Sequence, residues 1–440
     1  MTHSSMTRRR FLKGLVFGGS AALLAACGGA AAPSGGGAAA TSAPAASGGA
    51  AATSAPATSG SAATTLTWWD YYSEGANAVA MQAQLKRYTD SHPNVTIQRT
   101  AIPFADLKQK LLQGAAAGQL PDIVVIDNPD HSAFAALGVL EDLTDRVKAW
   151  GQDKAYFDGP WKSTTYQGKN YGIPDNSNCL VLWYNTEFTG PAKVNPPTNW
   201  DELKSAAKAL TQGDRFGLAV SGIKSEEGTF QWLPFLWETG ADLPTLNSDG
   251  GKAALQLWVD LVKGGNMSPG ILGWTQQDVL AQFQNRKAAM MINGPWQIPT
   301  LKKDNPDLKW QVVTLPQNKQ GASILGGENM AIVKGGKNID AAWELLTWTQ
   351  TPDNLKAYLT EAGKLPSRQD LANDPAWTGD PVLKVFIEQL KVAKPRAYGP
   401  KYPEISNAIQ EMMQAAISGQ KPVDAAVADA AAKITPLLPS

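Results

Sequence analysis

The sequence Pro121-Asp122-Ile123-Val124-Val125-Ile126-Asp127 contains the clearest structural signal in this chain. A run of four branched apolar residues, flanked by Pro-Asp and by Asp, is typical of a short strand that is buried on both faces. Strands of this kind belong to parallel sheets, whose connections are helices that cover the sheet. We therefore expect strands and helices to alternate around this segment.

The segment before this strand has the expected alternation. Short strands are predicted at residues 66–69 and 95–97. The helix between them places Val79, Ala83 and Tyr88 near one face, which we expect to pack on the sheet. A second helix carries Phe104, Leu107, Leu111 and Ala115 at helical spacing and ends at Gly118. This β-α-β-α-β pattern predicts an open α/β sheet with helices on both faces.

A second α/β unit follows the first. Strands are predicted at residues 179–184, 216–220, 288–292 and 311–315, and the helix after Thr198 has Trp200, Leu203, Ala207 and Leu210 on one side. A chain of 440 residues also exceeds what one hydrophobic core usually supports. We therefore predict two lobes.

Polar and aromatic residues follow the predicted strands of the first lobe. Trp69, Asp70 and Tyr71 come at the end of the first strand, and Asp127 and Asn128 at the end of the third. Ligands of open α/β sheets bind outside the carboxyl ends of the strands. These five residues are therefore candidates for a binding site.

The first 27 residues are typical of an export signal. Arg8, Arg9, Arg10 and Lys13 precede an apolar run at residues 15–26 that is too short to span a bilayer as a stable helix. The segment resembles a twin-arginine signal, and Leu24-Ala25-Ala26-Cys27 resembles the bacterial lipobox. The resemblance implies removal of residues 1–26 and attachment of acyl chains to Cys27, which would anchor the chain to a membrane.

Residues 28–65 contain only Gly, Ala, Ser, Thr and Pro and carry no charge, so we expect a flexible tether over residues 27–65. The only cysteine beyond it is Cys179, and no internal disulfide can form. We expect Cys179 to be a small buried residue without a reactive role.

The charge balance argues against nucleic acid as a partner. The chain has 39 basic and 39 acidic residues, and removing the four basic residues of the signal leaves 35 basic residues against 39 acidic ones. A mildly acidic body without a basic stripe lacks the clustered Lys and Arg that a phosphate backbone requires.

Several segments together resemble one family, the extracellular solute-binding proteins of ATP-binding-cassette (ABC) importers, in the large sugar-binding group that includes maltose-binding proteins. Their order and spacing over residues 66–440 carry the resemblance: Leu66-Thr67-Trp68-Trp69-Asp70, Leu120-Pro121-Asp122-Ile123, Tyr171-Gly172-Ile173-Pro174, Leu182-Trp183-Tyr184-Asn185, Asn293-Gly294-Pro295-Trp296, Gly326-Gly327, Lys364-Leu365-Pro366-Ser367-Arg368 and Tyr402-Pro403-Glu404-Ile405.

The resemblance implies a two-lobe, periplasmic-binding-protein-like (type II) α/β fold with a ligand cleft between the lobes. Lobe 1 would comprise residues 66–174 and about 322–365, and lobe 2 residues 175–321 and about 366–440. Hinge crossings are implied near Pro174, near residues 315–321 and near residues 359–366, and the lobes would close over the ligand. The family also implies ABC permease subunits as partners; we expect a monomer without a cofactor or a metal.

The chain contains 15 tryptophans, several of them at strand or loop ends. An aromatic face covers the apolar face of a sugar ring, while nearby carboxylates and amides bond its hydroxyl groups. Trp296 follows a predicted strand where the resemblance places a stacking aromatic, and it is the first candidate. Trp232 and Trp237 lie in an apolar stretch where one could face ligand and the other the core.

Further candidates lie at crossings, strand ends and late loops. Glu328 follows Gly326-Gly327, where glycine permits close approach of the backbone to a ligand. The remaining candidates are Asn176, Tyr184, Gly327, Arg368 and Tyr398. Ordinary loop or capping use is the alternative for Asn176 and Tyr184, and a solvated surface position is the alternative expected for Arg368.

An enzyme is the main competing hypothesis. Outside the signal, His92 and His131 are the only histidines, and neither lies in a zinc motif. A secreted glycosidase would need paired carboxylates such as Glu226 and Glu227, which we expect to be solvated in a loop. Among solutes, a neutral or weakly cationic polyol such as a sugar fits the strand-end residues best, and glycerol phosphate or a polyamine is the alternative.

Overall fold

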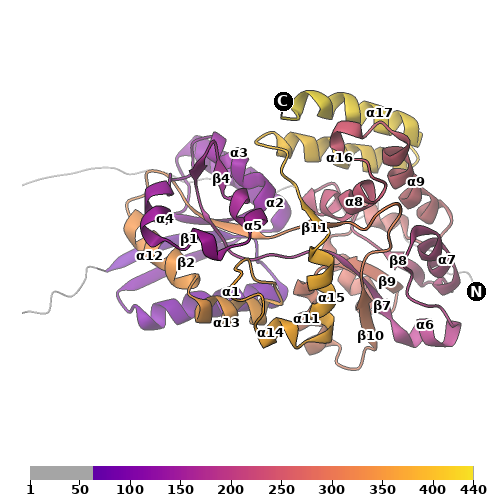
Figure 1. Cartoon of the computed structure of the whole chain (residues 1–440), viewed down its shortest axis with the longest axis horizontal. Helices are drawn as coiled ribbons and strands as arrows, with labels where there is room; N and C mark the ends of the chain where they lie inside the picture. The colour runs from indigo at the N-terminus through magenta and orange to yellow at the C-terminus, as the bar shows by residue number, and fades with distance from the viewer. Residues whose placement is uncertain (1–62, 440) are drawn as a thin grey trace, which may run out of the picture. The chain divides into compact units, whose positions relative to one another are not determined.

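The computed structural model describes residues 63–439 (Figure 1). The expected signal at 1–26, Cys27 and nearly all of the expected tether at 27–65 lie outside the described residues. Strand β1 (Thr64–Asp70) begins before residue 65, so the last two residues of the expected tether belong to a sheet.

The first lobe is built on a five-stranded sheet in the order β2-β1-β3-β12-β6. Strands β1, β2 and β3 are parallel, and β12 is antiparallel to both β3 and β6. Besides β1, the strands are β2 (Val95–Ala101), β3 (Ile123–Asp127), β6 (Ile173–Pro174) and β12 (Glu328–Ile332). Ile123 and Val125 pack in one apolar cluster and Val124 and Ile126 in another, so β3 is buried on both faces as predicted.

The second lobe is built on a four-stranded sheet in the order β10-β7-β9-β8. Its strands are β7 (Val181–Asn185), β8 (Phe216–Ala219), β9 (Ala288–Asn293) and β10 (Trp310–Val313), of which only β8 and β9 are parallel. Two small sheets complete the described strands: β4 (Thr165–Tyr166) with β5 (Lys169–Asn170), and β11 (Ser323–Leu325) with β13 (Ala393–Pro395).

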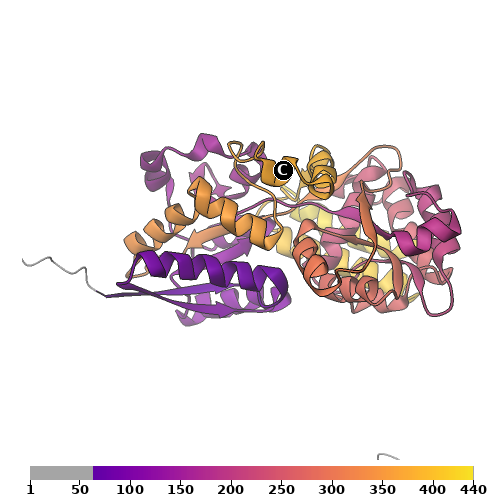
Figure 2. The same cartoon turned by 90° about the horizontal axis from the view of Figure 1, so that it is seen from below.

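Helices surround each sheet (Figures 1 and 2). Those around the first sheet are α1 (Gly75–Ser91), α2 (Phe104–Ala117), α3 (His131–Ala136), α4 (Thr144–Trp150), α5 (Asp158–Ser163), α12 (Ile339–Thr349) and α13 (Pro352–Ala362). Those of the second lobe are α6 (Thr186–Ala192), α7 (Trp200–Leu210), α8 (Glu226–Glu238), α9 (Asp249–Lys263), α10 (Gln276–Gln284), α11 (Ile298–Asp304), α14 (Pro375–Thr378), α15 (Pro381–Leu390), α16 (Tyr402–Ile417) and α17 (Val423–Ile434). Figure 2 shows α1 beside α13, far from it in sequence.

The chain passes between the two sheets along three neighbouring segments. The first crossing, residues 175–180, connects β6 to β7 and lies between the other two. Ser177 pairs with Leu365 of the third crossing, and Asn178 pairs with Gly326 of the second. The second crossing therefore contacts the first at Gly326, which lies C-terminal to the stretch expected at residues 315–321. These three segments form the floor on which the two lobes meet.

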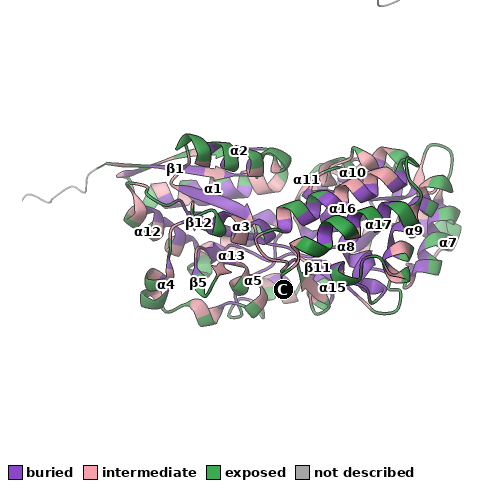
Figure 3. Ribbon diagram, turned by 90° about the horizontal axis from the view of Figure 1, so that it is seen from above, coloured by how far each residue is buried: buried purple, intermediate pink, exposed green. Residues whose placement is uncertain are grey.

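Burial differs from the sequence expectation at one helix (Figure 3). Val79 is 67% exposed, and the face of α1 that packs on the sheet carries Ala80, Met81, Gln84, Leu85 and Tyr88 instead. Cys179 is buried as expected, and its thiol lies against the carbonyl of Phe386. Within residues 63–439, no helix has the length and apolar character needed to cross a bilayer.

Candidate functional site

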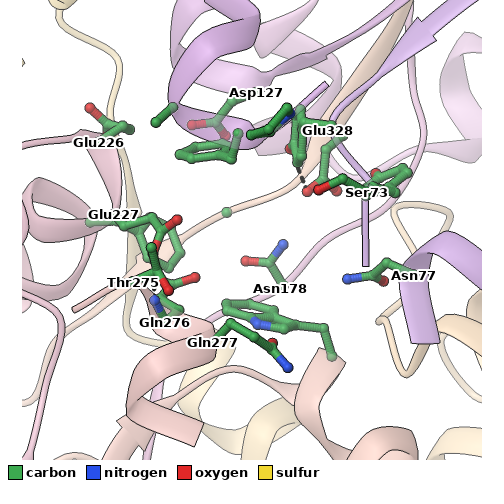
Figure 4. A pocket seen from close by; sticks show the side chains of 18 of the residues that line it. Ser73, Asn77, Asp127, Asn178, Glu226, Glu227, Thr275, Gln276, Gln277 and Glu328 are labelled. Atoms are coloured by element: carbon green, nitrogen blue, oxygen red, sulfur yellow. Dashed lines mark hydrogen bonds between the residues drawn. The ribbon is translucent and has the colours of Figure 1, made fainter. Parts of the chain in front are cut away.

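A cavity of about 240 Å³ lies where the two lobes and the crossings meet (Figure 4). The first lobe contributes the loop after β1, the start of α1 and the start of α2. The second lobe contributes the starts of α8 and α10 and the short 3-10 helix η6 (Pro295–Gln297). Asn178, Gly326, Gly327 and Lys364 of the crossings line its floor. In Figure 4, Glu226 and Glu227 approach from one side, and Ser73 and Asn77 from the opposite side.

Two carboxylates lie side by side at the edge of the first sheet. Glu328 begins β12, Asp127 ends β3, and the two residues are paired in the antiparallel register. Tyr71, just after β1, donates its hydroxyl to Oε1 of Glu328 at 2.6 Å. Lys364 donates to Oε2 of Glu328 at 2.8 Å and also to the hydroxyl of Tyr72 at 2.8 Å. The ends of three strands and one crossing therefore hold Glu328 in place.

Lys364 keeps Glu328 ionised despite its burial. Burial would raise the pKa of this carboxyl, but the charge and hydrogen bond of Lys364, with the hydroxyl of Tyr71, lower it below its ordinary value. Glu328 is therefore a fixed hydrogen-bond acceptor at the floor of the cleft.

A second buried charge cluster joins the two lobes. Arg396, which follows β13, donates to both oxygens of Asp127, at 2.8 and 3.0 Å. The same guanidinium donates at 2.6 Å to Glu226, the first residue of α8. Glu226 also accepts a hydrogen bond of 2.6 Å from Tyr402. Asp127 belongs to the first lobe and Glu226 to the second, so one guanidinium bridges the lobes.

Two carboxylates share this single cation. Burial raises the pKa of Asp127, the Arg396 guanidinium opposes that rise, and the neighbouring Glu226 adds to it. Both carboxylates in turn hold the pKa of Arg396 well above its ordinary value, although burial alone would lower it. The cluster is therefore one coupled unit that contains more acid than base.

Aromatic rings form much of the second-lobe wall. The ring of Trp296 lies directly over Gly294, because a Cβ atom at Gly294 would come within 1.9 Å of it. Trp296 is partly exposed, and its ring centre is 6.4 Å from that of Phe230. An apolar ring face opposite carboxylates suits a sugar ring, which has apolar C–H faces and polar edges.

Glu227 lies on the same wall, in the first turn of α8. Its Oε2 accepts a hydrogen bond from the backbone N–H of Gln276, the first residue of α10, at 2.5 Å. Burial raises the pKa of Glu227 from its ordinary value of 4.5 to about 7, against the lowering effect of that N–H. The expectation that Glu226 and Glu227 are solvated in a loop is therefore wrong: both begin a helix and line the cavity.

Gly327 is a glycine for steric reasons. Its φ is +144°, and an added Cβ would lie 2.3 Å from the carbonyl oxygen of Asn176. Residues with a Cβ rarely adopt this backbone conformation, so the close contact between the first and second crossings requires glycine at position 327.

The structure brings five of the predicted ligand residues together around the cavity: Tyr71, Asp127, Trp296, Gly327 and Glu328. Asn128 and Asn176 lie just behind this wall. Asn128 accepts a hydrogen bond from Arg396 at 3.1 Å, and Asn176 donates one to Asp175 at 3.1 Å.

The other residues predicted at the end of β1 lie away from the cavity. Asp70 is fully buried, where its oxygens accept hydrogen bonds from Arg99 at 2.7 and 2.8 Å and from the indole of Trp68 at 2.8 Å. Trp69 packs beside the cluster on the opposite face of the sheet, with Lys110 over its ring at 5.0 Å. Asp70 orders the chain that leads to Tyr71 and does not itself line the cavity.

Four of the other predicted ligand residues also lie outside the cavity lining. Tyr184 donates to Gln311 on the neighbouring strand, and Trp232 is wholly inside the second-lobe core. Arg368 is buried against Asp370, so the expected surface position of Arg368 is wrong. Tyr398 donates its hydroxyl to Asp242.

Sequence reasoning missed several residues of the cleft. Lys364 and Arg396 lie in irregular segments and reach the cavity only because distant parts of the chain meet there. Asn178 lies on the first crossing and had no motif of its own. A signal did exist for Glu227: Ser225 followed by two acidic residues is a typical helix start, which would have placed both acids at the helix N-terminus.

Two α/β lobes, joined by three adjacent crossings over a polar and aromatic cleft, define a hinged ligand-binding protein. The chain belongs to one such family, the bacterial extracellular solute-binding proteins, whose sequence profile matches residues 83–385. The family is extracellular, which locates the chain outside the cytoplasm.

Comparisons with individual proteins agree with this family. A Brucella abortus protein described as a binding protein is 27% identical over 368 residues, which cover 80% of this chain and 88% of the relative. An ABC transporter solute-binding protein from Thermotoga lettingae, bound to alpha-D-tagatose, is 28% identical with a TM-score of 0.80 and covers 86% of this chain and 100% of its own. Maltose-bound MalE3 of T. maritima is 25% identical with a TM-score of 0.80 and the same coverages. The expected two-lobe type II fold is confirmed.

Proposed function

We propose that this chain is the solute-binding lipoprotein of an ABC importer. It captures a saccharide by closing its two lobes, leaves the saccharide chemically unchanged, and delivers it to permease subunits in the membrane. The observation that carries the proposal is the composition of the cleft, where Trp296 of one lobe lines the same cavity as Tyr71 and Glu328 of the other.

The opposing walls offer what a sugar needs. Trp296 supplies an apolar face for the ring, and Glu328, fixed by Lys364, accepts hydrogen bonds from hydroxyl groups. Because these groups come from different lobes, a ligand that contacts both stabilises the closed arrangement over the open one. The sugars in the related Thermotoga structures, tagatose and maltose, support the same class of solute.

Thermal unfolding of the purified full-length protein tests the solute class. A ligand that binds only the folded state raises the melting temperature by mass action. We expect a selective rise with a neutral or amino saccharide, and no loss of that saccharide on incubation. A rise with only glycerol phosphate or a polyamine would overturn the saccharide, and consumption of the ligand would indicate a glycosidase.

A pair of tryptophan variants tests the site. Trp296→Ala removes the aromatic wall, and we expect calorimetry to show saccharide affinity weakened by roughly 1–3 kcal/mol, the range for a buried aromatic anchor. Trp69→Ala is the matched control, because Trp69 is also partly exposed but lies outside the cavity lining. Equal effects of the two substitutions would count against Trp296 as a ligand contact.

The membrane anchor rests on the sequence around Cys27, which precedes the described residues. Cys27→Ser should leave the protein in the soluble fraction, because one or more acyl chains at this position would provide the anchor. Saccharide affinity should remain unchanged. A Cys27→Ser protein that still requires detergent for extraction would contradict lipid attachment at this residue.

A further inference from the structure

The cleft contains more acid than its own basic residues can neutralise. Its lining includes five carboxylates and two cations: Glu74, Asp127, Glu226, Glu227, Glu328, Lys364 and Arg396. Lys364 is paired with Glu328, and Arg396 is shared by Asp127 and Glu226. Glu74 and Glu227 have no ion-pair partner within residues 63–439.

Glu227 is held so that one of its oxygens remains available. The N–H of Gln276 binds Oε2 and fixes the carboxylate at the start of α10, whereas Oε1 has no hydrogen-bond partner in the described part of the chain. Burial raises the pKa of this carboxyl most, and the negative charges of Asp278, on α10, and of Glu74, on the first lobe, raise it further. Both effects make a nearby positive charge favourable.

Asn178 provides a second unused acceptor in the same cavity. This residue is only 4% exposed, and its Oδ1 has no hydrogen-bond partner among residues 63–439. Gly326 leaves the space that the amide occupies, since a Cβ there would lie 2.0 Å from that oxygen. Figure 4 shows the Asn178 amide in the middle of the cavity, between Glu227 and Asn77. A buried, unpaired acceptor at the cavity can accept a hydrogen bond from a ligand that enters it.

The chemistry of the missing donor follows from the charges. A neutral hydroxyl could donate to Asn178, but it would leave the charges of Glu227 and Glu74 uncompensated. An ammonium group has three N–H donors and a positive charge, so it can satisfy a carboxylate and an amide oxygen together. The partly exposed face of Trp296 lines the same cavity and attracts cations as well.

We propose that the solute is a saccharide that carries a primary ammonium group, and that Glu227 is the residue that selects it, with Asn178 as the second acceptor and Glu74 as a supporting charge. This inference rests on the proposed saccharide-binding function and narrows it to amino sugars. Glu227 recognises the ammonium group, whereas Trp296 and Glu328 contact the ring and its hydroxyl groups.

Calorimetry with matched ligand pairs tests the inference on the full-length protein. Glucose, galactose, mannose and the β-1,4-linked glucose dimer are each compared with their 2-amino-2-deoxy counterparts at neutral pH. The N-acetylated forms serve as uncharged controls for size. In every pair that binds, we expect the amine to bind about tenfold more tightly than the hydroxyl form, as a charge-assisted hydrogen bond predicts.

Two carboxylate variants assign the effect to its residue. Glu227→Gln keeps the shape of the side chain but removes its charge, and it should reduce the tenfold preference for the amine to less than about twofold. Glu388→Gln, on the exposed side of α15, should keep the preference. A preference that persists in Glu227→Gln would overturn the role of Glu227.

The remaining outcomes separate this inference from the proposed function. Neutral sugars that bind as tightly as their amines would overturn the inference and leave the saccharide-binding function standing. If no saccharide of either kind binds, the proposed function fails and the inference fails with it. Binding of spermidine alone would have the same consequence and would identify a polyamine as the solute.

Discussion

Glu227 illustrates how one side chain can oppose the stability of the fold that holds it. Its carboxyl has a pKa of about 7 in the folded protein and an ordinary value of 4.5, chiefly because of burial. Between these two pH values the folded state binds more protons than the unfolded state. The contribution of Glu227 to stability therefore decreases as pH rises through this window. Asp175, whose pKa burial raises to about 6, acts in the same direction.

The pH dependence of unfolding tests this argument. The free energy of unfolding of the ligand-free protein, measured by urea denaturation, should decrease from pH 5 to pH 8 in part through Glu227. Glu227→Gln removes this titration, so the variant should lose less stability over the same interval. Glu388→Gln should follow the wild type. Identical pH profiles for Glu227→Gln and the wild type would show that Glu227 titrates near its ordinary pKa.

The start of β12 shows how a strand can depend on the residue before it. Glu328 reaches Asp127 and Tyr71 because Gly327 allows the second crossing to approach Asn176 closely before the strand begins. The position of a carboxylate that lines the cleft is thus set by a backbone contact that involves no side chain.

Substitution of Gly327 should therefore affect both stability and binding. Gly327→Ala introduces a Cβ 2.3 Å from a carbonyl oxygen at a φ of +144°, and we expect it to cost more than about 1 kcal/mol of unfolding free energy. Saccharide affinity should fall as Glu328 shifts. Gly321→Ala, on the same crossing, meets nothing closer than 3.6 Å and should change stability by less than about 1 kcal/mol. A tolerated Gly327→Ala would contradict the close contact.

Secondary structure was predictable where local pattern and tertiary burial agree. Residues 123–126 are apolar in succession, and both faces of β3 are covered. The prediction for α1 placed Val79 in the packed face, but the apolar spacing in this helix is weak. The polar residue Gln84 is buried there, at a position where an apolar residue would be expected. Tyr71 and Asp127 were predicted from strand ends, and Glu328 was predicted from the two glycines that precede it. Arg396 was not predicted, because its role depends on Asp127 and Glu226, which are far away in sequence.

The two lobes are connected by charge as well as by chain. Arg396 binds Asp127 of the first lobe and Glu226 of the second, and its side chain is almost completely buried. Charges removed from water cost free energy unless they are paired, so the stability of this junction depends on all three groups together. Substitution of Arg396, Asp127 or Glu226 should therefore destabilise the junction between the lobes.

Removal of the guanidinium should be costly. Arg396→Gln leaves two buried carboxylates without their cation, and we expect a loss of about 3–5 kcal/mol in unfolding free energy. Arg146→Gln is the control, because Arg146 pairs with the exposed Asp340 and should matter by less than about 1 kcal/mol. Urea denaturation compares the two. Similar losses in both variants would contradict a buried bridge between the lobes.

The enclosed thiol of Cys179 makes the molecule convenient for fluorescence labelling. Burial raises the pKa of this thiol and keeps it from solvent, so maleimide dyes should react with it slowly. With Cys27 replaced by serine, one new surface cysteine on each lobe would then take a donor and an acceptor dye almost selectively. Single-molecule energy transfer between the two dyes can follow the distance between the lobes as solute is added, without removal of the native Cys179.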